Sequence, residues 1–386
     1  MKYDLYDWSF GMQPRFDPYE INIKELTIYV NNYCNRACKH CYLPPNQEDI
    51  KMEWLQWCLN WFPIEKAIIV GGEPTLSSMF PVVCKKLKEY NVKISMSTNA
   101  KWVRWTGENP ELDKKWRNNG NGGPKDMQTV LTNFANVDSI QISIEGPREY
   151  NDQIRGPGSF DDSMKAIGLL KEKKKDVFFR VTYNRNNLNY VPDLLKLAEE
   201  KDIPIYFFPY KGNEPPLNSE QQQWLYNTLW NYTDPENPNH IALVAIPQFW
   251  CYGGEESDYC PAGKERINLM PDGLITPCEM SIPPHHFEIG NFNDEKFKTP
   301  EIFYKSVINK LEEFLFNIKT PDIGCNMCKH SKYCRSGCLE TNEYLTCPML
   351  EQIDLRLYSQ EMGVTHKALR LKMKNVGNAI ANRMGC

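Results

Sequence analysis

Three cysteines near the amino terminus carry the clearest chemical signal in this sequence. They lie in the run Cys34-Asn-Arg-Ala-Cys38-Lys-His-Cys41, shortly after the apolar stretch Leu26–Val30. A 4Fe–4S cluster is normally held by four thiolates, so a short loop that supplies three leaves one iron open to a small molecule. A zinc site with His40 as fourth ligand, or three unrelated buried thiols, are the alternatives. The triplet therefore favours redox chemistry at iron.

A second element follows the next predicted strand. The apolar run Lys66–Val70 leads directly into Gly71-Gly72-Glu73-Pro74. Two glycines allow the backbone to approach a ligand closely, and an acidic side chain beside them is suited to receive a cation. Taken alone, the same four residues are typical of a simple turn.

Together, the C-x3-C-x2-C spacing followed by Tyr42 and the Gly-Gly-Glu-Pro run resemble the signature of the radical S-adenosylmethionine (SAM) enzymes. The resemblance implies that Cys34, Cys38 and Cys41 hold a 4Fe–4S cluster whose open iron chelates SAM. An electron from the cluster then cleaves SAM to a 5′-deoxyadenosyl radical, which removes a hydrogen atom from the substrate. It further implies that the Gly-Gly-Glu-Pro element binds the SAM amine, with Glu73 as the acceptor.

Five more residues are candidates for contacts to SAM. Ser97 and Asn99 end the third predicted strand, where polar side chains would reach the ribose. Ser143 and Arg155 resemble family positions that contact the carboxylate and the ribose, and an arginine opposite a carboxylate makes a charge-assisted pair. His40 matches the position that stacks on adenine. The alternatives are a strand-end serine, a surface arginine and a polar loop residue.

Alternating strand and helix patterns from about Leu26 to Pro209 predict the fold. Such βα units form a parallel sheet with helices outside it, and six of them suit an open, partial (β/α)6 barrel of the α/β class. The cysteine loop would then lie with the chemistry at the carboxyl ends of the strands. Strands are expected at 66–70, 92–97, 139–143, 177–183 and 203–208, and helices at 52–62, 79–90, 160–174, 191–201 and 224–232. Segment 101–125 is too long for an ordinary connection and is either a lid or a variable surface excursion.

A second group of cysteines resembles the SPASM domain of peptide- and sulfatase-maturing enzymes. Its members are Cys260, Cys278, Cys325, Cys328, Cys334, Cys338 and Cys347. The resemblance implies two auxiliary 4Fe–4S clusters, one held by Cys260, Cys278 and Cys338, the other by Cys325, Cys328, Cys334 and Cys347. Cys251 is the favoured fourth ligand of the first, which otherwise keeps an open iron. A zinc ribbon would account for only one C-x2-C pair.

Glu279, directly after Cys278, occupies the place where sulfatase-maturing relatives have an acidic base. A carboxylate there would accept the proton that leaves when the substrate is oxidised. The alternative is a solvated turn residue.

Composition limits the class of protein. The chain has 386 residues, a net charge of −4 and 14 cysteines. It has no basic field for nucleic acid and no secretion signal or membrane span, so we expect a cytoplasmic protein whose cysteines bind metal rather than form disulfides. The expected parts are an N-terminal extension (1–25), the barrel (26–235), the auxiliary-cluster domain (236–350) and a C-terminal helix and tail (351–386).

The function implied by the resemblance is oxidative modification of a ribosomal peptide or protein side chain, by cross-linking or dehydrogenation. An electron donor of the flavodoxin or ferredoxin type is expected. Only about 25 residues precede the first strand, so leader recognition would require a separate protein or a substrate without a leader. The alternatives are a radical dehydrogenase of a small molecule, such as an aminocyclitol or sugar, and a non-catalytic iron–sulfur carrier.

Overall fold

The computed structural model describes the barrel region and part of the segment that follows it. The described residues are 21–43, 48–105, 126–211, 217–234, 236–244, 261–281, 287–294 and 299–316. Most of the predicted insertion, the predicted terminal helix and the predicted ligands other than Cys34, Cys38, Cys41 and Cys278 lie outside them.

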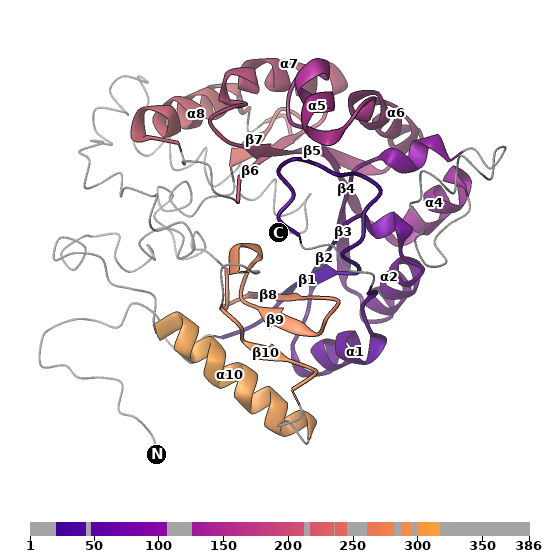
Figure 1. The fold of residues 1–386 in the computed structure, drawn as a ribbon, viewed down its shortest axis with the longest axis vertical. Coiled ribbons are helices and arrows are strands. Elements are labelled where there is room, and N and C mark those ends of the chain that lie inside the picture. The colour runs from indigo at the N-terminus through magenta and orange to yellow at the C-terminus, as the bar shows by residue number, and fades with distance from the viewer. Residues whose placement is uncertain are drawn as a thin grey trace, which may run out of the picture.

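One sheet organises the described chain, with the strand order β10-β9-β8-β1-β2-β3-β4-β5-β6-β7. Strand β8 and strands β1 to β7 pair in parallel, while β9 and β10 continue the sheet in antiparallel fashion. The sheet curves without closing (Figure 1). The strands are β1 (Glu25–Tyr29), β2 (Lys66–Val70), β3 (Lys93–Thr98), β4 (Ser139–Ser143), β5 (Asp176–Tyr183), β6 (Ile205–Pro209), β7 (Ala242–Val244), β8 (Arg266–Leu269), β9 (Leu274–Thr276) and β10 (Gly290–Asn291).

The helices that connect the parallel strands cover the outer face of the sheet (Figure 1). They are α1 (Met52–Trp61), α2 (Met79–Glu89), α4 (Met127–Asn133), α5 (Arg148–Arg155), α6 (Ser159–Glu172), α7 (Val191–Lys201) and α8 (Ser219–Tyr232), and α10 (Pro300–Phe316) follows β10. Short 3-10 helices are η3 (Pro74–Leu76), η4 (Lys101–Arg104), η5 (Phe134–Asn136), η6 (Leu188–Tyr190) and η7 (Glu279–Ser281). Every residue of β1 and of β4 is buried, as expected for strands covered on both faces.

The predicted open α/β barrel is confirmed. The predicted strands at 66–70 and 139–143 and the predicted helix at 191–201 coincide with β2, β4 and α7. The pattern did not predict α4, α5, α10 or the strands β7 to β10.

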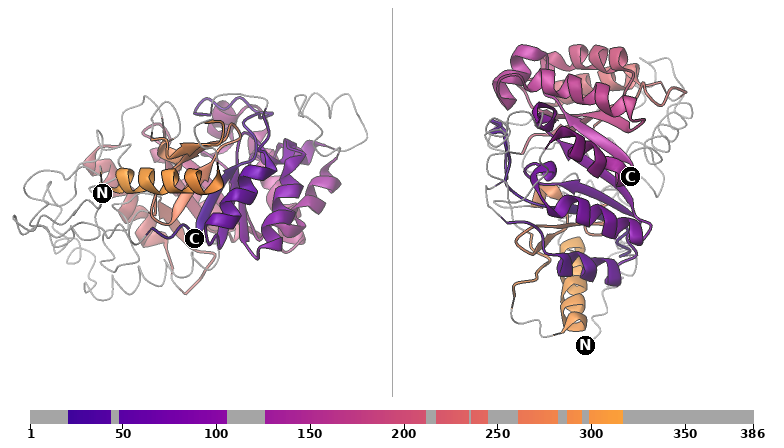
Figure 2. Two further views of the ribbon diagram at one scale, coloured as in Figure 1. Left: turned by 90° about the horizontal axis from the view of Figure 1, so that it is seen from below. Right: turned by 90° about the vertical axis from the view of Figure 1, so that its right-hand side faces the viewer.

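Two segments beyond residue 235 extend the sheet. Strand β7 pairs with β6, and β8 pairs with β1 on the side opposite β2. Helix α10 lies beside α1 (Figure 2), where the ring of Phe303 packs 4.8 Å from that of Trp57 between centroids. This packing holds α10 against α1, the helix of the first βα unit. Within the described part of the chain, no helix combines the length and the apolar character that a membrane crossing requires.

Candidate active site

The cysteine loop, residues 31–43, leaves the carboxyl end of β1 and packs directly on the turn after β2. The backbone N–H of Gly72 donates to the carbonyl of Asn31 at 3.0 Å, and that of Glu73 to the carbonyl of Tyr33 at 3.0 Å. A Cβ on Gly72 would lie 2.1 Å from the Tyr33 carbonyl oxygen, and Gly71 has φ +144°. The two glycines therefore give the cysteine loop room to approach, and their contact with SAM stays a prediction.

Glu73 joins the end of β2 to the end of β3. Its carboxylate is fully buried and accepts hydrogen bonds from Thr75 Oγ1 (2.7 Å), Thr98 Oγ1 (2.8 Å) and the Asn99 backbone N–H (2.7 Å). Burial raises the pKa of this carboxyl, and the surrounding donors oppose the rise. The contacts give Glu73 a positioning role, and its role as acceptor of the SAM amine stays a prediction.

Asn99 is placed against the cysteine loop. Its side-chain amide donates to Cys34 Sγ at 3.3 Å and to Asn35 Oδ1 at 2.9 Å. The side chain is thus close to a predicted cluster ligand, and its predicted contact with the ribose is not tested by these bonds.

The three loop cysteines differ in their surroundings. Cys34 and Cys38 are partly buried and Cys41 is exposed. Cys34 Sγ accepts from the Arg36 backbone N–H at 3.4 Å as well as from Asn99, and Arg155 Nη1 lies 4.0 Å from Cys38 Sγ. Burial raises the pKa of the Cys34 thiol to about 12.

N–H donors around sulfur suit cluster thiolates, because hydrogen bonds to sulfur tune iron–sulfur sites. The donor set of the cysteine loop therefore fits a 4Fe–4S cluster. Among the residues that the structure describes, no three His, Cys, Asp or Glu side chains form a group that holds a metal ion. Ligation by Cys34, Cys38 and Cys41 stays a prediction.

A buried carboxylate that the sequence reasoning missed holds Arg155 and His40. Glu145 follows β4 and accepts from Arg155 Nε at 2.8 Å and Nη2 at 2.7 Å, while His40 Nε2 lies 3.4 Å from the same oxygen. Burial lowers the pKa of His40, against the effect of Glu145. An acidic residue two positions after a buried strand was the available signal. Arg155 is therefore not a surface arginine, and its pairing with SAM stays a prediction.

Another predicted SAM contact, Ser143, is the last residue of β4. It is buried, and its backbone carbonyl accepts a hydrogen bond from Ser163 Oγ at 3.1 Å. Its predicted contact with SAM stays a prediction.

A second polar group, which we call the Arg180 cluster, consists of Ser97, Gln141, Arg180 and Glu279. Arg180 donates from Nη1 to Ser97 Oγ and to Gln141 Oε1, each at 3.2 Å, and from Nη2 to Glu279 Oε2 at 3.1 Å. It also lies over the ring of Phe208, 3.8 Å from the centroid. The cluster joins strands β3, β4 and β5 to η7. Gln141 and Arg180 were missed, although a polar residue inside an apolar strand pattern was a usable signal.

Glu279 is thus not a solvated turn residue. Its side chain is 15% exposed, and its backbone carbonyl accepts a hydrogen bond from Lys211 Nζ at 3.3 Å. Next to it, the hydroxyl groups of Tyr29 and Tyr42 form a hydrogen bond of 3.1 Å. Burial raises the pKa of both tyrosines. Cys278 is a partly buried thiol whose Sγ lies 3.4 Å from Ser281 Oγ.

Known proteins resemble this chain in sequence. Residues 28–198 match the family described as the radical SAM superfamily. The AdoMet-dependent heme synthase of Oleidesulfovibrio alaskensis is 23% identical over 344 residues, which cover 79% of each chain. The mycofactocin maturase MftC of Mycolicibacterium smegmatis is 24% identical over 346 residues, covering 84% of this chain and 80% of the relative.

Among solved structures, SuiB of Streptococcus suis bound to S-adenosylmethionine gives a TM-score of 0.61 at 18% identity, over 85% of this chain and 74% of that chain. SuiB bound to precursor peptide SuiA gives a TM-score of 0.60 at 19% identity, with the same coverage. At this identity the likeness establishes the fold.

Proposed function

We propose that this chain, which carries a radical SAM domain over residues 28–198, is an oxidoreductase that oxidatively modifies a ribosomal peptide or protein side chain. The observation that carries the proposal is the joining of the cysteine loop to the strand ends through Glu73 and Asn99. The similarity to a mycofactocin maturase supports a substrate of the peptide class.

In the proposed mechanism, Cys34, Cys38 and Cys41 hold the 4Fe–4S cluster. When bound, the cluster and SAM supply the radical chemistry. The chain's own residues fix the loop and its surroundings: Asn99 and the Arg36 backbone donate to Cys34 Sγ, and Glu145 orients Arg155 beside Cys38. Arg155, His40, Ser97 and Ser143 are the proposed contacts to SAM.

Removal of electrons from the substrate also releases a proton, and we assign its acceptance to Glu279. The Arg180 guanidinium holds this carboxylate in place, 3.1 Å from Nη2 to Oε2. Cysteines of the C-terminal part of the chain would hold two auxiliary 4Fe–4S clusters, which would supply an electron acceptor when bound. Their ligands are those implied by the sequence: Cys251, Cys260, Cys278 and Cys338 for one, and Cys325, Cys328, Cys334 and Cys347 for the other.

The test is anaerobic incubation of the reconstituted enzyme with SAM, dithionite and small peptides encoded beside its own gene. We expect peptides that lose the mass of hydrogen atoms with the wild-type enzyme and not with Cys34→Ala. Glu279→Gln should still cleave SAM and should modify peptide at least tenfold more slowly, since general base catalysis contributes on the order of 10²–10⁴-fold. Glu288→Gln, an exposed change in the same part of the chain, is the control.

A second candidate is a radical enzyme acting on a small molecule, which the similarity to an AdoMet-dependent heme synthase favours. The same reaction mixtures with an iron porphyrin in place of peptide separate the two. SAM cleavage with unchanged peptides and a modified porphyrin would replace the first proposal. Retained iron without any SAM cleavage would indicate a non-catalytic carrier.

A further inference from the structure

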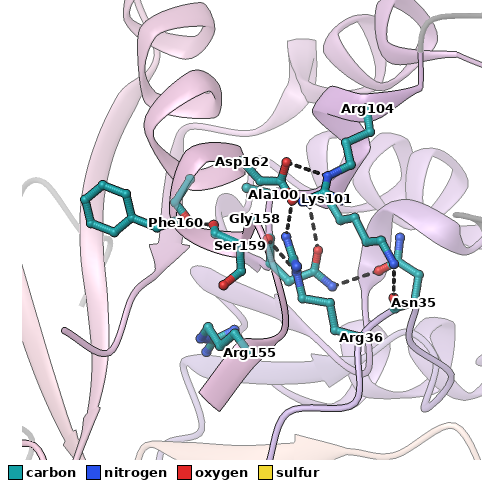
Figure 3. Close-up of polar contacts among 12 residues, drawn as sticks. Asn35, Arg36, Ala100, Lys101, Arg104, Arg155, Gly158, Ser159, Phe160 and Asp162 are labelled. Atoms are coloured by element: carbon teal, nitrogen blue, oxygen red, sulfur yellow. Dashed lines mark hydrogen bonds and ion pairs between the residues drawn. The ribbon is translucent and has the colours of Figure 1, made fainter. Parts of the chain in front are cut away.

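Asp162 connects the cysteine loop to two other segments of the fold. It lies in the first turn of α6, where its Oδ2 is 2.5 Å from Arg36 Nη2 and its Oδ1 is 2.7 Å from Arg104 Nε (Figure 3). The side chains of Arg36 and Asp162 are only 3% and 7% exposed. We call Arg36, Arg104 and Asp162 the Asp162 network. The carboxylate of Asp162 forms ion pairs with both an arginine of the cysteine loop and an arginine of η4.

The start of α6 is shaped for this contact. Gly158 has φ +74°, and a Cβ on it would lie 2.5 Å from Arg104 Nη2. That same nitrogen donates to the Pro157 carbonyl at 3.1 Å, and Lys165 Nζ donates to the Val103 carbonyl at 3.1 Å. Helix α6 therefore holds η4 at two places, through Asp162 and Lys165, and Pro157 just before the helix adds a third contact. These contacts fix the position of Asp162 relative to the cysteine loop.

Arg36 connects Asp162 to Cys34. Its Nε donates to the Asn99 carbonyl at 3.3 Å, while Asn99 Nδ2 donates to Cys34 Sγ. The backbone N–H of Arg36 itself donates to the same sulfur at 3.4 Å. Two N–H donors to Cys34 Sγ thus belong to Arg36 itself and to Asn99, whose carbonyl the Arg36 side chain binds.

Three cationic side chains lie around Asp162. Lys101 Nζ donates to the Asn35 carbonyl at 2.5 Å, close to the two arginines (Figure 3). Arg36, Lys101 and Arg104 lie around one carboxylate, Asp162, while the buried carboxylate of Glu73 also acts on Cys34. The three cations and the hydrogen bonds to sulfur act in the same direction, since both favour the more negative, reduced state of a cluster bound to Cys34.

We propose that Asp162 is a positioning residue for the cluster ligand Cys34, acting through Arg36 to aim two N–H donors at the Cys34 sulfur and so to make the cluster easier to reduce. The proposal rests on the proposed function only in requiring a 4Fe–4S cluster at Cys34. Partners of this kind, which orient the ligands of a metal, tune the properties of many metal sites.

Two variants separate positioning from charge. Arg36→Lys keeps the positive charge, but one ammonium group lacks the planar fork that reaches both Asp162 and the Asn99 carbonyl. Asp162→Asn removes a negative charge, so by charge alone it would make the cluster easier to reduce. Positioning predicts that both variants make it harder to reduce. Asp161→Asn is the matched control, because Asp161 directly precedes Asp162 in α6 and its side chain is 62% exposed.

The measurement is a redox titration of the reconstituted full-length enzyme, followed through the electron paramagnetic resonance signal that SAM perturbs. We expect the ratio of reduced to oxidised cluster at a fixed potential to fall at least fivefold in Arg36→Lys and Asp162→Asn, and to stay within twofold in Asp161→Asn. A wild-type ratio in Arg36→Lys, or a raised ratio in Asp162→Asn, would show that charge alone acts and would overturn the proposal.

Amide hydrogen exchange of residues 34–41 in the full-length chain gives a second readout that needs no turnover. It should be faster in Arg36→Lys and Asp162→Asn than in Asp161→Asn. Faster exchange with an unchanged redox titration would reduce the network to a structural role and overturn the proposal. A wild-type chain that takes up no iron would overturn the proposed function as well, which distinguishes the two failures.

Discussion

Glu73 shows how one side chain organises the site. Its buried carboxylate accepts from Thr75, Thr98 and Asn99, and Asn99 in turn donates to Cys34. Glu73→Gln replaces an acceptor oxygen with a donor that faces other donors. We expect a loss of about 1.5–3 kcal/mol in the free energy of unfolding, the usual range for a hydrogen bond to a charged group. Urea unfolding of the variant and the wild type measures it.

Glu65→Gln is the control for this change, since Glu65 is a glutamate with a 56% exposed side chain beside β2. Its unfolding free energy should move by less than about 0.5 kcal/mol. Unchanged stability of Glu73→Gln together with lost SAM affinity would contradict the positioning role and return Glu73 to the role of acceptor for the SAM amine.

The sequence predicted which residues gather at the strand ends better than it predicted their hydrogen-bond partners. Cys34, Glu73 and Asn99 belong to separate strand ends, and the rule that parallel strands end at one edge brought them together. The hydrogen bond from Asn99 to Cys34 Sγ joins residues 65 positions apart. No local pattern encodes such a bond, because it depends on side-chain directions that the packing of the whole sheet decides.

At the scale of elements, the turn after β2 and the cysteine loop fit only because glycine has no side chain. Gly72→Ala would place a Cβ 2.1 Å from the carbonyl oxygen of Tyr33, and backbone atoms give way only at high cost. We expect the loop to shift, and iron content after anaerobic reconstitution to fall at least threefold, while the circular dichroism of the barrel stays close to that of the wild type.

Gly168→Ala is the matched control, because a Cβ there meets nothing within 4 Å in the exposed face of α6. It should leave iron content unchanged and raise stability by up to about 1 kcal/mol, the helix preference of alanine over glycine. Full iron content in Gly72→Ala would show that the two loops separate without cost.

Elements with a strong pattern were predictable and polar or short ones were not. The apolar strand β2 and the amphipathic helix α7 lie where the sequence places them. Helix α5, which carries Arg155, has only eight residues and a mostly polar composition. Strand β8 has four residues and a partner far away in the sequence. Local propensity is too weak to specify elements whose stability comes from tertiary contacts.

For the whole molecule, the segment 261–316 is held on the barrel by aromatic packing. The ring of Phe303 is 4% exposed and packs against Trp57 and Phe292, with centroids 4.8 and 4.7 Å away. Phe303→Ala should cost about 3–5 kcal/mol and lower the temperature of a single unfolding transition, because the segment and the barrel share one sheet. Differential scanning calorimetry measures it.

Ile302→Ala, at a position 49% exposed on the same helix, should change little. A new low-temperature transition in Phe303→Ala, with the main transition unmoved, would mean that the segment unfolds independently of the barrel.

The position of β1 between β2 and β8 affects the chain while it is being synthesised. Strand β8 begins 241 residues after β1, from 266 − 25. At roughly 5–20 residues per second on the ribosome, about 10–50 s pass before the second partner of β1 is made. Throughout that interval one edge of β1 offers unpaired N–H and C=O groups to any passing strand. The pace of translation, and not the stability of the finished sheet, sets how long the strand that leads to the cysteines is exposed to aggregation.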